Sequence, residues 1–434
     1  MTESIINELA QLPSLRVCPR DTVFRYRNDN HDTSRVAHDL NVRAIVTGRL
    51  MRRGDDLSVS VELLDAKDKK QLWGKRYDRK ISDALAMQHE ISRKIFEVLR
   101  AKVPGASGRR LSKRGTDNPD AYQAYLKGRY YWNRRTVANI GKALAQFQKA
   151  VDADPVYALA YIGLADSYAV LPQYAGVTSA ETRPKARAAA ERALEIDDSL
   201  AEAHASMGYI DMMSWRFKEA ESDFGRAIAL DPNYSTGHQW YGIFLHVIGR
   251  RDEALAESRR AQQLDPLSPI ITVQVCNLHM LNGRLPEGID ECRKALELDE
   301  GFPRAHDLLG WAYLKQGKSA AAISEFSKAA AASGRASQEL SYLGYGYGVL
   351  KRREEAMAVL KQLERMHAER RSPAMYLAAV YAGLGDKDQA FAWLEKDFQA
   401  QNGALIYMTY FPIYDTLRDD PRHRDLARRI GLKL

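Results

Sequence analysis

Residues 235–266 read STGHQWYGIFLHVIGRRDEALAESRRAQQLDP, and this stretch decides the fold. Apolar side chains recur at helical spacing on both sides of a short GRRDE turn that begins at Gly249. Asp265 and Pro266 end the second segment, because proline cannot continue a helix. The pattern predicts a helix, a tight turn and a second helix.

The same helical hairpin recurs along the chain with a constant period, the step from Gly249 to Gly283. Small residues recur in three independent columns, and an aspartate recurs in the turn between hairpins. One such hairpin cannot bury its own apolar face, so the repeat predicts a stacked solenoid. The columns are Gly249, Gly283, Gly317, Lys351 and Gly385; Ala220, Ala254, Gly288, Ala322, Ala356 and Ala390; Gly208, Gly242, Cys276, Gly310, Gly344 and Ala378; and Asp197, Asp231, Asp265 and Asp299.

One repeat contains Leu309-Gly310-Trp311-Ala312-Tyr313, then Ala322 and Ala329, with Asp299 in the turn ahead of it. These positions resemble the tetratricopeptide-repeat family. The resemblance implies a mainly α fold, a right-handed superhelix of helical hairpins, with about eight repeats over residues 119–404. We therefore expect a tetratricopeptide-repeat solenoid behind a small N-terminal α+β domain.

Two segments depart from the period. The step from Asp154 to Asp197 is longer than one period, so residues 171–183 are expected to form a longer turn between two helices. Residues 405–434 do not follow the repeat and are expected to form a C-terminal cap with a polar face.

The first hundred residues follow another pattern. Residues 42–79 alternate polar and apolar side chains as strands do, with Arg53-Gly54-Asp55 as a hairpin turn. Helical spacing flanks them at residues 3–12, 33–40 and 83–99. We expect a small α+β domain over residues 1–102.

Residues 36–79, VAHDLNVRAIVTGRLMRRGDDLSVSVELLDAKDKKQLWGKRYDR, resemble the TolB amino-terminal-like domain that precedes tetratricopeptide repeats in bacterial regulators. Residues 124–136 and 415–432 extend the resemblance. It implies an effector beside this module: a serine/threonine kinase, a class III adenylate cyclase or a winged-helix domain. The family begins with a further strand ahead of the helix that here opens at Thr2. We expect that strand to be missing, or to be supplied by an effector domain or a partner.

The net charge of +8 lies in the first quarter of the 434-residue chain. Residues 1–102 hold 20 Lys and Arg against 15 Asp and Glu, residues 103–118 hold 4 against 1, and residues 119–434 hold 40 of each. A neutral array is a poor phosphate-binding surface. The basic residues 103–118 are interpreted as a Gly/Ser linker, with nucleic-acid binding by the N-terminal region as an alternative.

The sequence predicts no catalytic residue, no cofactor and no metal site. Residues 312–319 fit a loose phosphate-loop pattern, but helical sequence precedes them where a strand is required. His204, His238 and His306 share one repeat position, and units stacked about 10 Å apart cannot share a zinc ion. They are expected to be packing residues.

Compartment is predicted from weak signals. Cys18, Cys276 and Cys292 fit neither a disulfide framework nor a zinc site, which favours a reducing compartment. Acidic residues in the first ten positions do not suit a signal peptide. We expect a cytoplasmic protein without membrane contact, or an extracytoplasmic one if a membrane segment lies upstream.

The first helix of each unit is expected to line a concave groove that holds a peptide. Aromatic, aliphatic and amide groups dominate the side chains predicted to project into it, and the lysine that a carboxylate clamp uses is missing from them. The candidates are Tyr209, Gln239, Ile243, Asn277, Arg304, Asp307, Trp311 and Tyr345.

The leading hypothesis is a non-catalytic protein-interaction scaffold, the sensory or partner-docking module of a bacterial signalling protein. Aromatic anchors in an apolar groove suit an extended or helical peptide. The alternatives are the C-terminal part of a kinase or adenylate cyclase whose catalytic domain is not in this chain, and a regulator that binds nucleic acid through its basic N-terminal region.

Overall fold

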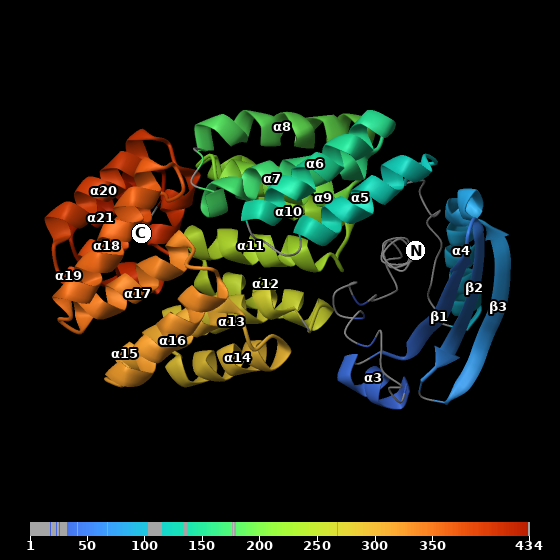
Figure 1. Ribbon diagram of the computed structural model, residues 1–434, viewed down its shortest axis with the longest axis horizontal. Helices are drawn as coiled ribbons and strands as arrows, with labels where there is room; N and C mark the ends of the chain where they lie inside the picture. The colour runs from blue at the N-terminus through green and yellow to red at the C-terminus, as the bar shows by residue number, and fades with distance from the viewer. Residues whose placement is uncertain are drawn as a thin grey trace.

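The computed structural model contains a small α+β unit followed by a long array of helices (Figure 1). This confirms the predicted fold class. The predicted helix at residues 3–12 and most of the basic linker lie outside the described residues. The structure describes residues 18, 23, 26, 33–40, 42–66, 68–102, 115–132, 137–175, 177, 179–266 and 268–432.

The α+β unit holds an antiparallel three-stranded sheet of order β1-β2-β3 in the described part of the chain. Gly54, with φ +59°, makes the predicted turn between the first two strands. The elements are α3 (Thr33–Leu40), β1 (Ala44–Arg53), β2 (Asp56–Asp65), β3 (Lys70–Lys80), η1 (Ile81–Asp83) and α4 (Ala84–Lys102).

One face of the sheet packs on α4. Alternate side chains of β2, from Leu57 to Leu63, are buried against Met87, Ile91 and Ile95 of that helix. Period-two alternation puts these side chains on one face of the strand, which is why the sequence pattern found them. This small core is separate from the core of the array.

The outer edge of β1 has no strand beside it within the described residues. Leu50 and Met51 of β1 are 55% and 58% exposed. The strand expected ahead of Thr2 falls outside the described residues. An unpaired edge of this kind is able to accept another strand.

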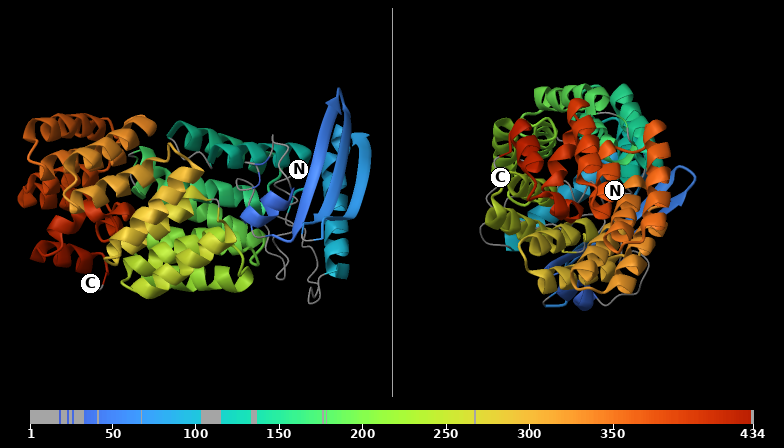
Figure 2. Two further views of the ribbon diagram at one scale, coloured as in Figure 1. Left: turned by 90° about the horizontal axis from the view of Figure 1, so that it is seen from below. Right: turned by 90° about the vertical axis from the view of Figure 1, so that its left-hand side faces the viewer.

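The array consists of antiparallel helix pairs. The described residues between 119 and 399 form eight of them. The pairs are stacked along and around the long axis of the molecule (Figures 1 and 2). They are α5 (Pro119–Trp132) with α6 (Val137–Ala153), α7 (Ala158–Ala175) with α8 (Ser179–Ile196), α9 (Ala201–Met212) with α10 (Phe217–Leu230), α11 (Ser235–Val247) with α12 (Arg251–Leu264), α13 (Pro269–Leu281) with α14 (Leu285–Leu298), α15 (Pro303–Lys315) with α16 (Ser319–Ala332), α17 (Ser337–Val349) with α18 (Arg353–Ala368), and α19 (Ala374–Leu384) with α20 (Lys387–Gln399).

The small-residue columns mark the closest contacts within each pair. A Cβ added at Gly310 would lie 2.6 Å from the ring of Phe326, which is fully buried on the facing helix. The turn column has left-handed backbone, with φ of +72° at Gly317 and +61° at Lys351. Only glycine adopts this conformation without strain, which explains why glycine dominates that column.

The expected longer turn at residues 171–183 is wrong. Helix α7 continues through Pro172 to Ala175, and α8 begins at Ser179 and contains Pro184. The extra residues therefore lengthen the two helices, and α8 begins beside the C-terminal end of the array, where Ser179 contacts Asn402.

The expected polar cap is also wrong for its first half. Residues 403–414, in η2 (Gly403–Met408) and η3 (Pro412–Leu417), are all buried. Viewed along the long axis, the C-terminal elements lie among the surrounding helices (Figure 2). Only α21 (Pro421–Arg429) has the charged surface of a cap, and its arginines pair with Asp388 and Glu395 of α20.

Two cysteines form a disulfide, which the sequence analysis did not predict. Cys276 on α13 and Cys292 on α14 are bonded, with Cα atoms 5.4 Å apart. They occupy the repeat positions that Gly310 and Phe326 occupy two helices later, so hairpin packing itself brings them together. The cysteine pattern therefore no longer favours a reducing compartment.

The glycine contact gives a matched pair of variants. We expect Gly310→Ala to lower the free energy of unfolding by about 1–2 kcal/mol, because the new methyl group collides with the Phe326 ring. Gly141→Ala, which meets nothing within 4 Å on α6, should raise it by about 0.5–1 kcal/mol through helix propensity. Urea unfolding measures both, and equal effects of the two changes would contradict the packing described.

The disulfide closes a loop of 16 residues. Its reduction should lower the free energy of unfolding by about 3 kcal/mol, because the unfolded chain gains conformational freedom. Urea unfolding of Cys18→Ser, with and without a phosphine reductant, measures the difference without interference from the third cysteine. Identical curves would show that Cys276 and Cys292 are not bonded.

Candidate functional site

The predicted groove residues lie on the first helices of consecutive units, and Tyr209, Asn277 and Arg304 among them contact residues 402–417. Most are buried: Asp307 is 0% exposed, and Trp311 is 5% exposed. Ile243 and Arg304 are half-buried. We call the predicted residues the inner wall: Tyr209 on α9, Gln239 and Ile243 on α11, Asn277 on α13, Arg304, Asp307 and Trp311 on α15, and Tyr345 on α17.

Residues 402–417 of the same chain cover this wall, and we call this segment the plug. The hydroxyl of Tyr407 lies 3.4 Å from that of Tyr209. Asn277 Nδ2 donates to the main-chain oxygen of Tyr410 at 3.4 Å. The inner wall is therefore occupied at α9 and α13.

The plug continues along the wall to α15. The Arg304 guanidinium lies 4.5 Å from the centre of the Phe411 ring. Lys315, which also lies over the Trp311 ring, makes an ion pair with Asp415 at 3.3 Å. The expectation of an open peptide groove is wrong for this structure, because the chain's own C-terminal segment fills it.

Apolar burial holds the plug in place. Leu405, Ile406, Met408, Ile413 and Leu417 are each fully buried. Burying one such side chain stabilises a protein by roughly 1.5–3 kcal/mol, so the five together contribute on the order of 10 kcal/mol. Replacing Trp311 or Tyr345 by alanine would therefore damage this core as well as any contact with a partner.

Polar groups on the wall offset part of that gain. Both carboxylate oxygens of Asp307, both terminal nitrogens of Arg304 and Nε1 of Trp311 are buried without a hydrogen-bond partner. The same is true of Asn277 Oδ1 and His246 Nδ1. Each unsatisfied buried group costs about 1–3 kcal/mol, so the plug seals the wall without completing its hydrogen bonds.

Burial also shifts the acid–base equilibria of this wall. It raises the pKa of Asp307 well above its usual range, and it raises the pKa of Glu339 on the next first helix to about 7. The pKa of His246, which is edge-on to the Tyr410 ring, falls to about 4 because burial disfavours its charged form. Of these three groups His246 contacts the plug, and burial there favours its neutral form.

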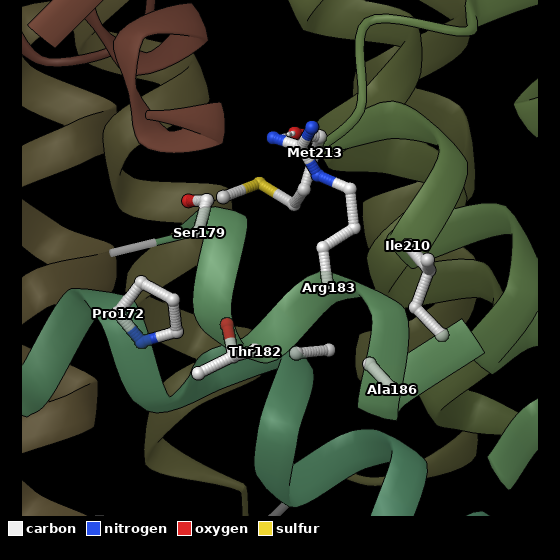
Figure 3. Close-up of a pocket in the computed structure, with 8 residues that line it drawn as sticks. Pro172, Ser179, Thr182, Arg183, Ala186, Ile210 and Met213 are labelled. Atoms are coloured by element: carbon white, nitrogen blue, oxygen red, sulfur yellow. Dashed lines mark hydrogen bonds between the residues drawn. The ribbon is translucent and has the colours of Figure 1, made fainter. Parts of the chain in front are cut away.

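A second cluster closes the array on itself, and we call it the latch: residues 179–183, Trp215, Phe398 and residues 401–403. Arg183 Nη2 donates to the main-chain oxygen of Gln401 at 2.8 Å and reaches that of Met213 at 3.4 Å. Figure 3 shows Arg183 and Ser179 reaching from α8 toward Met213. A cavity of about 20 Å³ lies among them.

The latch joins parts of the chain that are far apart in the sequence. Ser179 donates to Asn402 and accepts from the main-chain N–H of Gly403 at 3.1 Å. Glu181 makes an ion pair with Arg370 at the end of α18. The lengthened α8 supplies both contacts, so the residues beyond the repeat period build the closure.

Trp215 closes the latch at the cost of backbone strain. It stands one period before Gly249 in the turn column, with φ +60°, and its ring stacks on Phe398 at 5.7 Å. A left-handed conformation is unfavourable for a bulky residue by roughly 1–2 kcal/mol. The stack compensates for that strain, which explains a tryptophan in a glycine position.

The three aligned histidines hold the turns between units. Nε2 of His238 lies 3.0 Å from the oxygen of Pro232 in the preceding turn, and its Nδ1 contacts Glu257. His204 and His306 make the equivalent contacts with Asp223 and Glu325. These residues clamp each hairpin to the preceding turn, a role that the packing interpretation did not include.

The described residues contain no cluster of His, Cys, Asp or Glu arranged to hold a metal ion. Gly317 of the loose phosphate-loop pattern lies in the turn between α15 and α16. In the same described part of the chain, every helix is too short or too polar to cross a membrane.

Sequence reasoning missed the plug, although one signal was present. Residues 403–414 read GALIYMTYFPIY and carry no charge, which does not suit an exposed cap. It also missed Arg183 and Trp215, because neither stands in a motif. Trp215 would have been found by extending the turn column one period toward the N-terminus.

A sequence model of the tetratricopeptide repeat matches residues 277–338. Together with the repeated hairpins and their stacking, this decides the fold. The array is a tetratricopeptide-repeat solenoid. Among solved structures, it is similar to human IFIT1 bound to m7Gppp-AAAA (15% identity, TM-score 0.49, 73% of this chain and 78% of that one). It is also similar to PilF of Pseudomonas aeruginosa (22% identity, TM-score 0.37, 48% and 94%).

Two curated proteins match the sequence of this solenoid chain. Putative adenylate cyclase 3 of Rhizobium meliloti is 30% identical over 228 residues, which are 51% of this chain and 38% of that protein. The transcriptional regulator HilA of Salmonella typhimurium is 23% identical over 270 residues, 61% of this chain and 47% of HilA. The chain thus spans less than half the length of either relative.

The wall carboxylate gives a pH-dependent prediction. Because the pKa of Asp307 is raised in the folded state, its contribution to stability is present near pH 4 and is lost as pH rises through the folded pKa. Asp307→Asn should therefore match the wild type near pH 4. Above pH 4, the free energy of unfolding of the variant should rise relative to that of the wild type, by up to about 1.4 kcal/mol per pH unit.

Urea unfolding of both proteins between pH 4 and pH 9 measures this difference. His246 titrates in the opposite direction, but it is present in both proteins and its contribution cancels in the comparison. Glu339 titrates in the same direction as Asp307 and interacts with it by charge, so Asp307→Asn also removes its repulsion with Asp307. A variant that is less stable than the wild type at pH 9 would show that Asp307 is charged and well paired.

Proposed function

We propose that this chain is the partner-docking half of a bacterial regulatory protein, with residues 1–102 as a TolB-like unit and the solenoid as the docking scaffold. In this proposal the chemistry belongs to an effector, a kinase, adenylate cyclase or winged-helix domain. Cytoplasmic localisation stays a prediction.

The support comes from the two curated relatives. One is named for nucleotide cyclisation and the other for transcriptional control. The two matches cover 51% and 61% of this chain, so both relatives match some of the same residues of it. A region common to proteins with different outputs is best explained as the part that receives a partner or signal. This overlap is the observation that carries the proposal.

The fold is consistent with that role. Solenoids present extended surfaces built from repeated units, and they serve widely as interaction scaffolds. Two surfaces support the proposal: the edge of β1, which has no strand beside it within the described residues, and the inner wall beneath the plug. A strand supplied by an effector or partner would suit the first of these.

A two-hybrid assay tests the proposal. The full chain is paired with kinase, class III cyclase and winged-helix domains encoded in the same genome, and one class should give a signal at least tenfold above an unrelated domain. The purified chain, incubated with ATP and Mg²⁺ or Mn²⁺, should form no cyclic AMP.

Two results would overturn this function. Cyclic AMP formed by the purified chain alone would make it an enzyme. The absence of a signal with all three effector classes would remove the docking role.

A further inference from the structure

We propose that the plug is an internal ligand of the inner wall, and that an extended, aromatic-rich segment of a partner protein takes its place when the latch opens. This rests on the proposed docking function and names the surface and the chemistry of the partner. The plug would then keep the wall closed until that partner is present.

The wall holds the plug as it would hold a peptide. Asn277 binds a main-chain oxygen, which any peptide offers. Tyr209 and His246 contact the tyrosine rings at positions 407 and 410, and Arg304 lies over the ring of Phe411. Main-chain recognition together with aromatic anchors defines the segment that fits this wall.

The plug satisfies only part of the wall. Its own 3-10 turns use its main-chain N–H groups: those of Leu405, Thr409 and Tyr410 donate to oxygens within the plug. The plug therefore offers few free N–H groups to the wall, and both carboxylate oxygens of Asp307 on α15 are buried without a hydrogen-bond partner. An extended segment keeps its N–H groups free, so it would pair with the wall better than the plug does.

The latch provides a way for the plug to leave without unfolding the hairpins. It joins α8 and the α9–α10 turn to the end of α20, and none of its contacts lies within a repeat. Residues 400 and 401 connect the end of α20 to the plug, and the latch holds residues 401–403. Loss of the Trp215 stack and the Arg183 hydrogen bonds would release that connection and relieve the strain at Trp215.

Hydrogen exchange of the full chain tests the release. The latch variant carries Trp215→Gly and Arg183→Ala. Lys351→Gly is the matched control, since Lys351 occupies the same turn column with φ +61° and is exposed outside the latch. Amides of residues 403–417 should exchange at least tenfold faster in the latch variant, with those of α13 unchanged. The control should equal the wild type.

Slow exchange of the plug would contradict the proposal. If residues 403–417 exchange no faster than α13 in all three proteins, the plug opens only with global unfolding. It is then permanent core, and the proposal is wrong.

A synthetic peptide tests the exchange itself. A fluorescent copy of residues 402–417 should bind the latch variant at least tenfold more tightly than it binds the wild type. A copy carrying Tyr410→Ala and Phe411→Ala should lose that binding. Equal binding of both copies, or no binding by either, would overturn the proposal.

The two proposals fail separately. Peptide binding to the isolated chain needs no effector, so it survives if the docking role is wrong. If the plug is permanent, the two-hybrid signal with an effector remains and is unchanged by the latch substitutions.

Discussion

The structure depends on one constraint: a helical hairpin that cannot bury its own apolar face must be covered by something else. Along the array, each hairpin is covered by the next. Across it, the first helices turn their side chains to a shared inner wall, and the end of α20 comes back to α8. An apolar wall enclosed in this way has to be filled, and residues 402–417 fill it.

The repeat was readable from sequence because the contacts that impose it are local. Gly310 faces Phe326 within one hairpin, and Gly317 fixes the turn between them, so the period of the sequence records the packing directly. The groove residues lie on the first helices of consecutive units for the same reason. The sheet followed from the alternation of β2.

What the sequence could not supply were contacts between distant units. Arg183 and Gln401 are 218 residues apart, and Tyr209 and Tyr407 are 198 apart, with no shared motif to link them. Occupancy of the wall depends on these pairs. The disulfide was missed differently: Cys276 and Cys292 are a packing pair of one hairpin, a spacing that cysteine motifs do not include.

The central claim is that the array closes on itself around its own C-terminal segment. Spin labels at positions 181 and 370, the exposed partners across the closure, test it in a Cys18→Ser background by double electron–electron resonance. A closed array gives one narrow distribution of distances between the two labels, at the short end of the measurable range. A broad distribution of label-to-label distances centred at long values would show an open solenoid and contradict the account.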